Sequence, residues 1–399
     1  MHVLSIDLRT LRTSTAVLAL TTAAVVLAGC AGSSLDQSGG GQSGDAVKIG
    51  LLVPLSGVYA PLGEDMRNGF QLYLDQHAGK LGNRTVEVVS ADEGEGPQTG
   101  VPAAQKLVTQ DQATAVVGVV NSATALGLRD FFHESKKPLL VANAGADDIT
   151  GARKSAYVWR TSFANGKVAA PLGPAVAKEV KGGVYLIAAD YAAGREMVAG
   201  FRKTFEAAGG KVAGEKYTPF GKTQDFQPFL SAIRGSDAKA VYAFYAGAEA
   251  VSFVKQYQQF GLADSTPLYG TGFLTEGGVL DAQGDAAVGV KTSLHYSSEL
   301  DTPRNKEFVD AYRKAYDEAP TVYAVQAYDA ASVLDKALAK APGGTGDELV
   351  KALGTVGTVD SPRGGWSFDA DHDAQQKYYL REVRSTGGTV VNAVLSELS

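Results

Sequence analysis

Short β-branched runs alternate with amphipathic helical patterns over most of the chain, and this alternation constrains the fold more than any other feature. Residues 47–53 form the first run, and Met66, Phe70 and Tyr73 follow at helical spacing after a glycine-containing loop. Runs of the same kind lie at 85–90, 113–120, 138–142, 183–188, 212–217, 240–244 and 267–270. Strands that alternate with helices of about 10–15 residues predict an α/β fold built from doubly wound parallel sheets.

The length of the chain predicts two lobes. Residues 46–399 are too many for one compact hydrophobic core, and the glycine-containing breaks at 165–166 and 272 suggest lobe boundaries. Beyond residue 30 no apolar run reaches about 18 residues, so no membrane-spanning helix is expected there. A net charge of −6 argues against nucleic-acid binding, which needs clustered Lys and Arg to neutralise phosphates.

The first 45 residues have the features of an export segment. Two arginines precede an apolar stretch, 15–27, that has the length of a secretory signal and is too short to span a bilayer. The stretch ends in a Leu-Ala-Gly-Cys motif that resembles the bacterial lipobox, and Cys30 is the only cysteine in the chain. That resemblance implies a signal peptide over 1–29, a lipidated Cys30 and a flexible Gly/Ser tether as far as residue 45. An ordinary signal peptide that carries a cysteine is the alternative.

Small, hydroxyl-bearing and aromatic residues follow the predicted strands. In parallel sheets, ligands bind at the carboxyl ends of the strands, so these residues are candidates for a binding site. They predict a small-molecule pocket, with Asn121 and Ser122 after one strand and aromatic walls from the others. The candidate aromatic residues, which supply apolar area with a polar tip, are Tyr59, Tyr191, Tyr245, Phe273 and Tyr296.

Several motifs in this order resemble the leucine/isoleucine/valine-binding proteins, which have the type I periplasmic-binding fold. The motifs lie at 50–57, 117–122, 190–195, 284–289 and 327–330, and the resemblance covers roughly residues 48–390. It implies an extracytoplasmic, monomeric substrate-binding protein of an ABC importer, with permease and ATPase subunits as partners. It also implies three crossovers between two lobes, with lobe one formed by 46–162 and 274–374, and lobe two by 163–273 and 375–399.

The resemblance also implies roles for individual residues. Ser122 matches the hydroxyl that grips the ligand carboxylate, and Glu249 matches the carboxylate that accepts the ligand ammonium. Ala144 matches the residue whose backbone carbonyl faces the same ammonium. Ala146 departs from the family pattern, because the amino-acid binders carry a hydroxyl there. The departure leaves two ligand classes open, branched-chain or related amino acids and aromatic or other simple carboxylates.

Structural roles are an alternative for both polar residues. Ser122 and Thr124 precede a helical pattern, where a hydroxyl is an ordinary N-cap and where the helix end itself favours an anion. Glu249 lies in the first turn of another predicted helix, where a carboxylate complements the helix dipole.

No catalytic motif stands out. The five histidines lack metal-binding spacing, and the chain has no Gly-x-Ser-x-Gly elbow or phosphate-binding loop. Asp369, Asp371 and Asp373 imitate the start of a calcium loop, but Ala374 and Leu380 replace its glycine and its bidentate glutamate. We therefore expect no catalytic residues, no metal and no cofactor. A ligand sensor that does not transport is the remaining alternative class.

Overall fold

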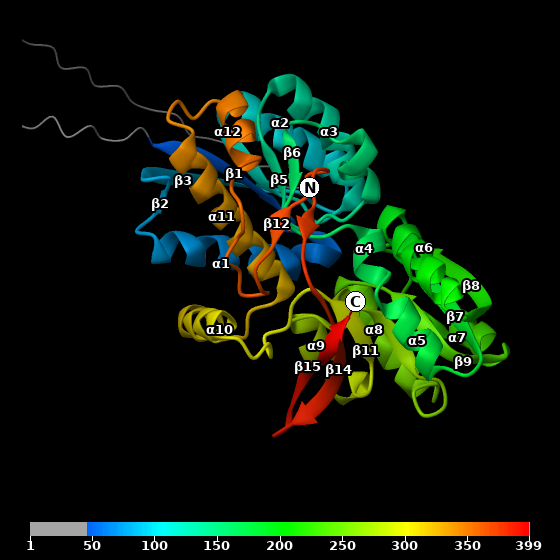
Figure 1. Ribbon diagram of the computed structural model, residues 1–399. Coiled ribbons are helices and arrows are strands. Elements are labelled where there is room, and N and C mark those ends of the chain that lie inside the picture. The colour runs from blue at the N-terminus through cyan, green and yellow to red at the C-terminus, as the bar shows by residue number, and fades with distance from the viewer. Residues whose placement is uncertain (1–45, 399) are drawn as a thin grey trace, which may run out of the picture. The chain divides into compact units, whose positions relative to one another are not determined.

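The computed structural model describes residues 46–398 of the chain. The predicted signal peptide, Cys30 and the tether lie outside the described residues. Within the described part, no helix is both long enough and apolar enough to cross a membrane. Two sheets, each with helices on both faces, organise this part of the chain (Figure 1).

The first sheet contains six strands from the first half of the chain. In spatial order they are β2 (Lys80–Leu81), β3 (Arg84–Asp92), β1 (Val47–Val53), β4 (Ala115–Gly118), β5 (Leu139–Val141) and β6 (Val158–Arg160). All neighbours are parallel except β2 and β3. These two form a hairpin across Gly82 and Asn83, which both have positive φ, as a tight two-residue turn requires.

The side chains of β1 alternate between the two faces of this sheet. Leu51 packs on one face against α1 (Ala60–Gln76) and α11 (Val322–Lys340), while Leu52 packs on the other against α2 (Pro97–Thr109) and α3 (Ser122–Ser135). Because both faces are covered, the strand is apolar and buried from Ile49 to Val53. Helix α12 (Gly346–Leu353) packs beside α11, and α10 (Pro303–Tyr316) contacts α1.

The second sheet contains seven strands. In spatial order they are β15 (Thr389–Leu398), β14 (Tyr378–Thr386), β11 (Lys291–Leu294), β10 (Leu268–Thr271), β9 (Ala238–Phe244), β7 (Gly183–Asp190) and β8 (Lys211–Pro219). The strands β11, β10, β9, β7 and β8 are parallel to one another. Strand β14 runs antiparallel to β11 and forms an antiparallel hairpin with β15.

Helices cover both faces of the second sheet as well. One face is covered by α6 (Ala192–Ala207), with α4 (Asn165–Ala169) and α5 (Leu172–Glu179) beside it. The other is covered by α7 (Gln227–Arg234), α8 (Gly247–Gln259) and α9 (Gly278–Gln283). The prediction of an α/β fold with parallel sheets in two lobes is confirmed.

The sheet pairing differs from the predicted lobe boundary after residue 273. Strand β11 pairs with β10 and β14, so residues 291–294 lie in the second sheet and not in the first lobe. Polar Thr292 and Ser293 interrupt the apolar pattern of this short segment, so its sequence did not predict a strand. The chain returns to the first sheet after Leu294, when α11 packs against α1.

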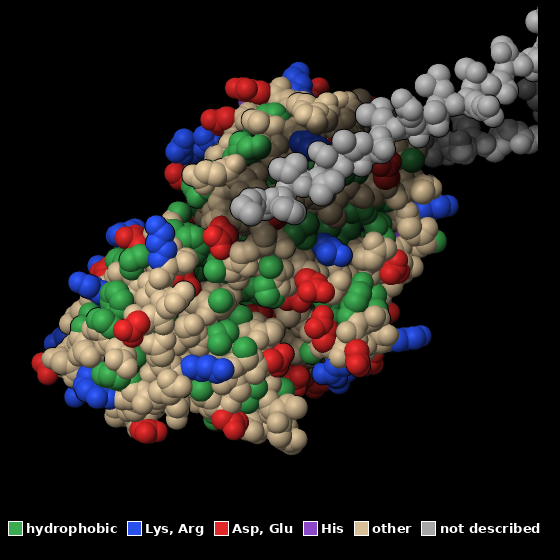
Figure 2. Space-filling view, turned by 180° about the vertical axis from the view of Figure 1, so that it is seen from behind, with side chains coloured by type: hydrophobic (Ala, Val, Ile, Leu, Met, Phe, Trp, Pro, Cys, Tyr) green, Lys and Arg blue, Asp and Glu red, His purple; other side chains and the backbone are tan. Residues whose placement is uncertain are grey.

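Three buried ion pairs lie near the passages of the chain between the sheets. They join Arg160 to Asp373, Arg363 to Asp329 and Arg381 to Glu276. Arg363 also donates to the carbonyl oxygens of Thr161 and Ser162, the residues that leave the first sheet after β6. In contrast, acidic and basic side chains are interspersed on the surface shown in Figure 2.

Candidate ligand-binding site

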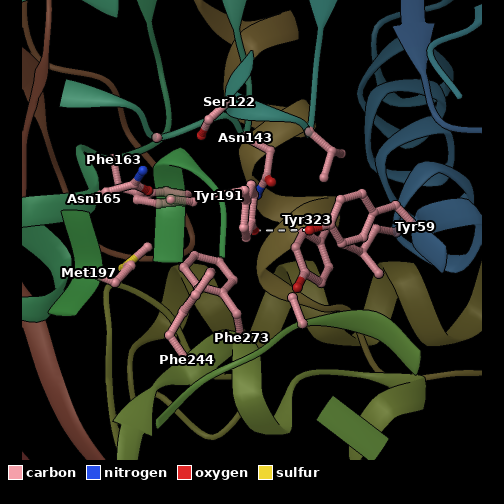
Figure 3. Close-up of a pocket in the computed structure, with 15 residues that line it drawn as sticks. Tyr59, Ser122, Asn143, Phe163, Asn165, Tyr191, Met197, Phe244, Phe273 and Tyr323 are labelled. Carbon is pink, nitrogen blue, oxygen red and sulfur yellow. Dashed lines mark hydrogen bonds between the residues drawn. The ribbon is translucent and has the colours of Figure 1, made fainter. Parts of the chain in front are cut away.

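A cavity lies at the carboxyl ends of strands from both sheets (Figure 3). Its lining is aromatic, apolar or neutral polar throughout, and contains no charged side chain among the described residues. The lining residues are Tyr59, Leu62, Val120, Ser122, Asn143, Gly145, Phe163, Asn165, Tyr191, Ala193, Met197, Phe244, Ala246, Phe273 and Tyr323.

Each lobe supplies one of the two tyrosines that meet at the cavity. Tyr59 immediately precedes α1 of the first lobe, and Tyr191 immediately precedes α6 of the second. Their hydroxyl groups form a hydrogen bond of 3.0 Å, drawn as the dashed line in Figure 3. Tyr191 also stacks on Phe220, with ring centroids 4.3 Å apart. The cavity is therefore bridged by a contact between the lobes.

Ser122 is the first residue of α3 and faces the cavity from the first lobe (Figure 3). The cap of this helix is Asn121, whose Oδ1 accepts the N–H groups of Ala123 and Thr124 at 2.8 and 3.2 Å. The structure thus makes Asn121 the cap and leaves Ser122 in the cavity wall. The hydroxyl and the amide of Ser122, at the positive end of the helix, can donate to an anion.

Glu93 lies behind the start of α3, and the sequence did not identify it as a candidate site residue. It is fully buried, and its carboxyl oxygens accept the N–H groups of Val120 and Asn121 at 2.7 and 2.8 Å. Burial raises the pKa of Glu93 to about 8 despite these hydrogen bonds. Burial likewise raises the pKa of Asp65, on α1, to about 8.

These two carboxyls predict how stability depends on pH. The pKa values of Asp65 and Glu93 are higher in the fold than in the unfolded chain, where they are near 3.8 for Asp65 and 4.5 for Glu93. The stability that these two carboxyls contribute is therefore complete below their unfolded-state pKa values, and it is lost as pH rises through about 8. We expect the free energy of unfolding to fall between pH 5 and about 8, and Glu93→Gln to flatten this decline. Urea unfolding at several pH values measures it, with exposed Glu87→Gln as the control. An unchanged slope in Glu93→Gln contradicts the prediction.

Glu249 does not line the cavity. Its Oε1 accepts the N–H of Gly221 at 2.9 Å, and the backbone amides of Lys222 and Thr223 also hydrogen-bond to its carboxylate. The side chain therefore caps the loop that follows β8 and is 7% exposed. Burial raises the pKa of Glu249. Glu249, which was predicted to bind the ligand ammonium, therefore directs its carboxylate at this loop.

The other predicted site residues divide into two groups. Tyr59, Ser122, Tyr191 and Phe273 line the cavity, whereas Asn121, Ala144, Ala146, Tyr245 and Tyr296 do not. The Ala146 carbonyl accepts a hydrogen bond from Arg160 at 2.5 Å, and the Tyr245 ring packs against Phe226 and Phe253 in the core of the second lobe. Asn143, Phe163, Asn165, Met197, Phe244 and Tyr323 line the cavity but were not predicted. Asn143 and Phe244 lie at strand ends, which is the signal that could have identified them.

Comparison with known proteins agrees with this architecture. The profile of the family described as periplasmic binding protein matches residues 46–388. Leu/Ile/Val-binding protein homolog 6 of Brucella melitensis is 34% identical, over 87% of this chain and 90% of its own.

Solved structures share both fold and sequence with the chain. A solute-binding protein of an ABC transporter from R. palustris, in complex with benzoate, is 38% identical with a TM-score of 0.83. The match covers 89% of this chain and 98% of that chain. A solute-binding protein from Rhodopseudomonas palustris BisB5, in complex with 3,4-dihydroxy benzoic acid, is 31% identical with a TM-score of 0.84, over 89% and 97% of the two chains. The chain belongs to the leucine/isoleucine/valine-binding proteins of the periplasmic binding protein family.

Proposed function

We propose that this protein is the extracytoplasmic solute-binding component of an ABC importer and that it captures a small aromatic monocarboxylate. The observation that carries the proposal is the composition of the cavity wall. Ser122 and the start of α3 favour an anion, while six aromatic rings surround the remaining space and no acidic side chain is present in the described lining.

An α-amino acid fits this wall less well than an aromatic acid does. Its ammonium group loses water on burial and needs a carboxylate or several acceptors in return. Glu249, the candidate partner, is engaged by the amides of the 221–223 loop. A benzoate-like acid needs an anion site at one end and apolar surface elsewhere, as the cavity provides. The R. palustris relative in complex with benzoate supports the same choice.

A branched-chain amino acid is the second candidate. It is favoured by the Brucella relative, whose name is that of a Leu/Ile/Val-binding protein, and by the apolar character of the wall. In either case, capture proceeds by closure of the two lobes around the solute, with the permease and ATPase subunits as partners.

Calorimetry with benzoate and leucine separates the two candidates. We expect benzoate to bind and leucine to give no measurable heat, and we expect Glu249→Gln to change benzoate affinity by less than about twofold. Loss of an ammonium partner would instead weaken leucine binding at least tenfold, since breaking a buried charged pair costs about 2–5 kcal/mol. Tight leucine binding that falls in this way in Glu249→Gln contradicts the assignment of an aromatic acid. Glu206→Gln, an exposed change on α6, is the control.

We also propose that a lipid on Cys30 anchors the protein to the bacterial cell membrane on its extracytoplasmic side, at the outer face or in the periplasm. The Leu-Ala-Gly-Cys motif supports this proposal, because it matches the bacterial lipobox at all four positions. We expect Cys30→Ser to abolish labelling by a palmitate analogue and to release the protein from the membrane fraction. Ser33→Ala, within the tether, should leave both unchanged. A Cys30→Ser protein that remains membrane-bound contradicts the proposal.

A further inference from the structure

We propose that the captured acid carries a hydrogen-bond donor on its ring, a phenolic hydroxyl, and that Asn165 Oδ1 accepts it. The inference rests on the proposed capture of an aromatic monocarboxylate and names the substituent that this cavity selects. Asn165 is 1% exposed, begins α4 and lies in the cavity wall. Figure 3 shows it beside Phe163 and separate from Ser122.

The orientation of the Asn165 amide follows from its neighbours. Its Nδ2 donates to Oε2 of Glu196 at 2.8 Å. That same oxygen accepts the backbone N–H of Asp147 at 3.0 Å, so it acts as an acceptor. An amide oxygen in the place of Nδ2 would face an acceptor without a proton between them. The NH₂ group of Asn165 is therefore turned towards Glu196, and Oδ1 is turned away from it.

The Oδ1 atom of Asn165 is buried and has no hydrogen-bond partner among the described protein groups. It lies close to Gly145, another residue of the cavity wall, where an added Cβ would come within 2.2 Å of it. A buried amide oxygen without a donor is unfavourable, and almost all such groups in folded proteins are paired. A solute that brings an O–H or N–H group to this point gains a hydrogen bond that a plain hydrocarbon ring cannot form.

The other polar groups of the cavity wall discriminate less strongly between ligand substituents that donate a hydrogen bond and those that do not. The hydroxyl of Tyr323 is also buried and has no hydrogen-bond partner within residues 46–398, but a hydroxyl both donates and accepts and can adapt to either kind of substituent. The hydroxyls of Tyr59 and Tyr191 are already paired with each other. An amide oxygen only accepts, so Asn165 is the group that distinguishes a donor from an isosteric non-donor.

A phenolic hydroxyl suits this acceptor better than an ammonium group does. Both groups donate, but the ammonium also brings a full charge into a wall that has no charged side chain among the described residues. The phenol is neutral and needs one acceptor. A ring with a carboxylate directed at Ser122 and a hydroxyl directed at Asn165 satisfies both polar points.

The test compares matched ligand pairs by calorimetry. We expect 3- or 4-hydroxybenzoate to bind about tenfold more tightly than the fluorobenzoate with the same substitution, which has similar size and no donor. In Asn165→Ala the two members of the pair should bind alike, while benzoate itself still binds. Tyr323→Phe is the matched control, and it should keep the preference for the hydroxyl because its side chain is not the proposed acceptor.

Other outcomes overturn the inference in distinguishable ways. Equal affinity of wild-type protein for the hydroxyl and fluoro ligands excludes it, and this comparison does not depend on the folding of any variant. Loss of the preference in Tyr323→Phe but not in Asn165→Ala transfers the role to Tyr323. Leucine binding that depends on Asn165 identifies an ammonium as the donor. Failure of every aromatic acid to bind rejects the proposed function itself.

Discussion

Arg363→Met is expected to lower the free energy of unfolding by about 3–5 kcal/mol, because it leaves a buried carboxylate without its cation. Arg363 and Asp329 are 2% and 0% exposed, and their side chains are 2.8 Å apart. Trp366 and Ser361 also donate to the same carboxylate, but both are neutral and cannot compensate its charge. Chemical denaturation followed by circular dichroism measures the change.

The buried pair is expected to behave differently from an exposed pair. Arg384→Met removes a guanidinium that is 55% exposed and pairs with Glu382 on the same strand, so it should cost less than about 1 kcal/mol. The double variant Arg363→Met/Asp329→Leu should recover much of the lost stability, because no unpaired charge remains buried. A single Arg363→Met protein as stable as the Arg384→Met protein would falsify this account of the ion pair.

Ser122→Asp is expected to weaken binding of benzoate at least about a hundredfold. The substituted carboxylate would lie near the ligand carboxylate, and two like charges about 4 Å apart repel by roughly 4 kcal/mol at the effective dielectric constant of a protein site. Calorimetry measures the effect, and a melting curve establishes that the variant folds.

Two further substitutions at the same position locate the cause. Ser122→Thr keeps a hydroxyl and should retain most of the affinity, whereas Ser122→Ala removes one hydrogen bond to a charged group, worth about 1.5–3 kcal/mol. If Ser122→Asp binds benzoate as tightly as the wild-type protein, the carboxylate does not lie at the start of α3. The position of the anion would then have to be sought at another donor of the wall.

The folding class and the location of the cavity follow from local patterns. The β-branched run at 47–53 and the helical spacing from Met66 to Tyr73 are properties of consecutive residues, and they correspond to β1 and α1. The rule that ligands bind at the carboxyl ends of parallel strands then directs attention to Tyr59, Ser122 and Tyr191, which do line the cavity. These features depend on short stretches of chain and on general topology.

The roles of other polar residues depend on which distant segment folds against them. Glu249 lies in the first turn of α8, but its carboxylate accepts hydrogen bonds from the 221–223 loop. Asn121 and Ser122 are neighbours of similar polarity, and only the helix geometry makes the first a cap and the second a wall residue. No local pattern distinguishes these alternatives.

Long-range packing also decided the parts of the site that were not predicted. Tyr323 reaches the cavity from α11, far along the chain, and Asn165 is oriented by Glu196, which belongs to a different helix. Strand β11 joins the second sheet because β10 and β14 offer it hydrogen-bond partners on both sides. Periodicity reports which side of an element is buried, whereas the partner that buries it is chosen by contacts between segments distant in sequence.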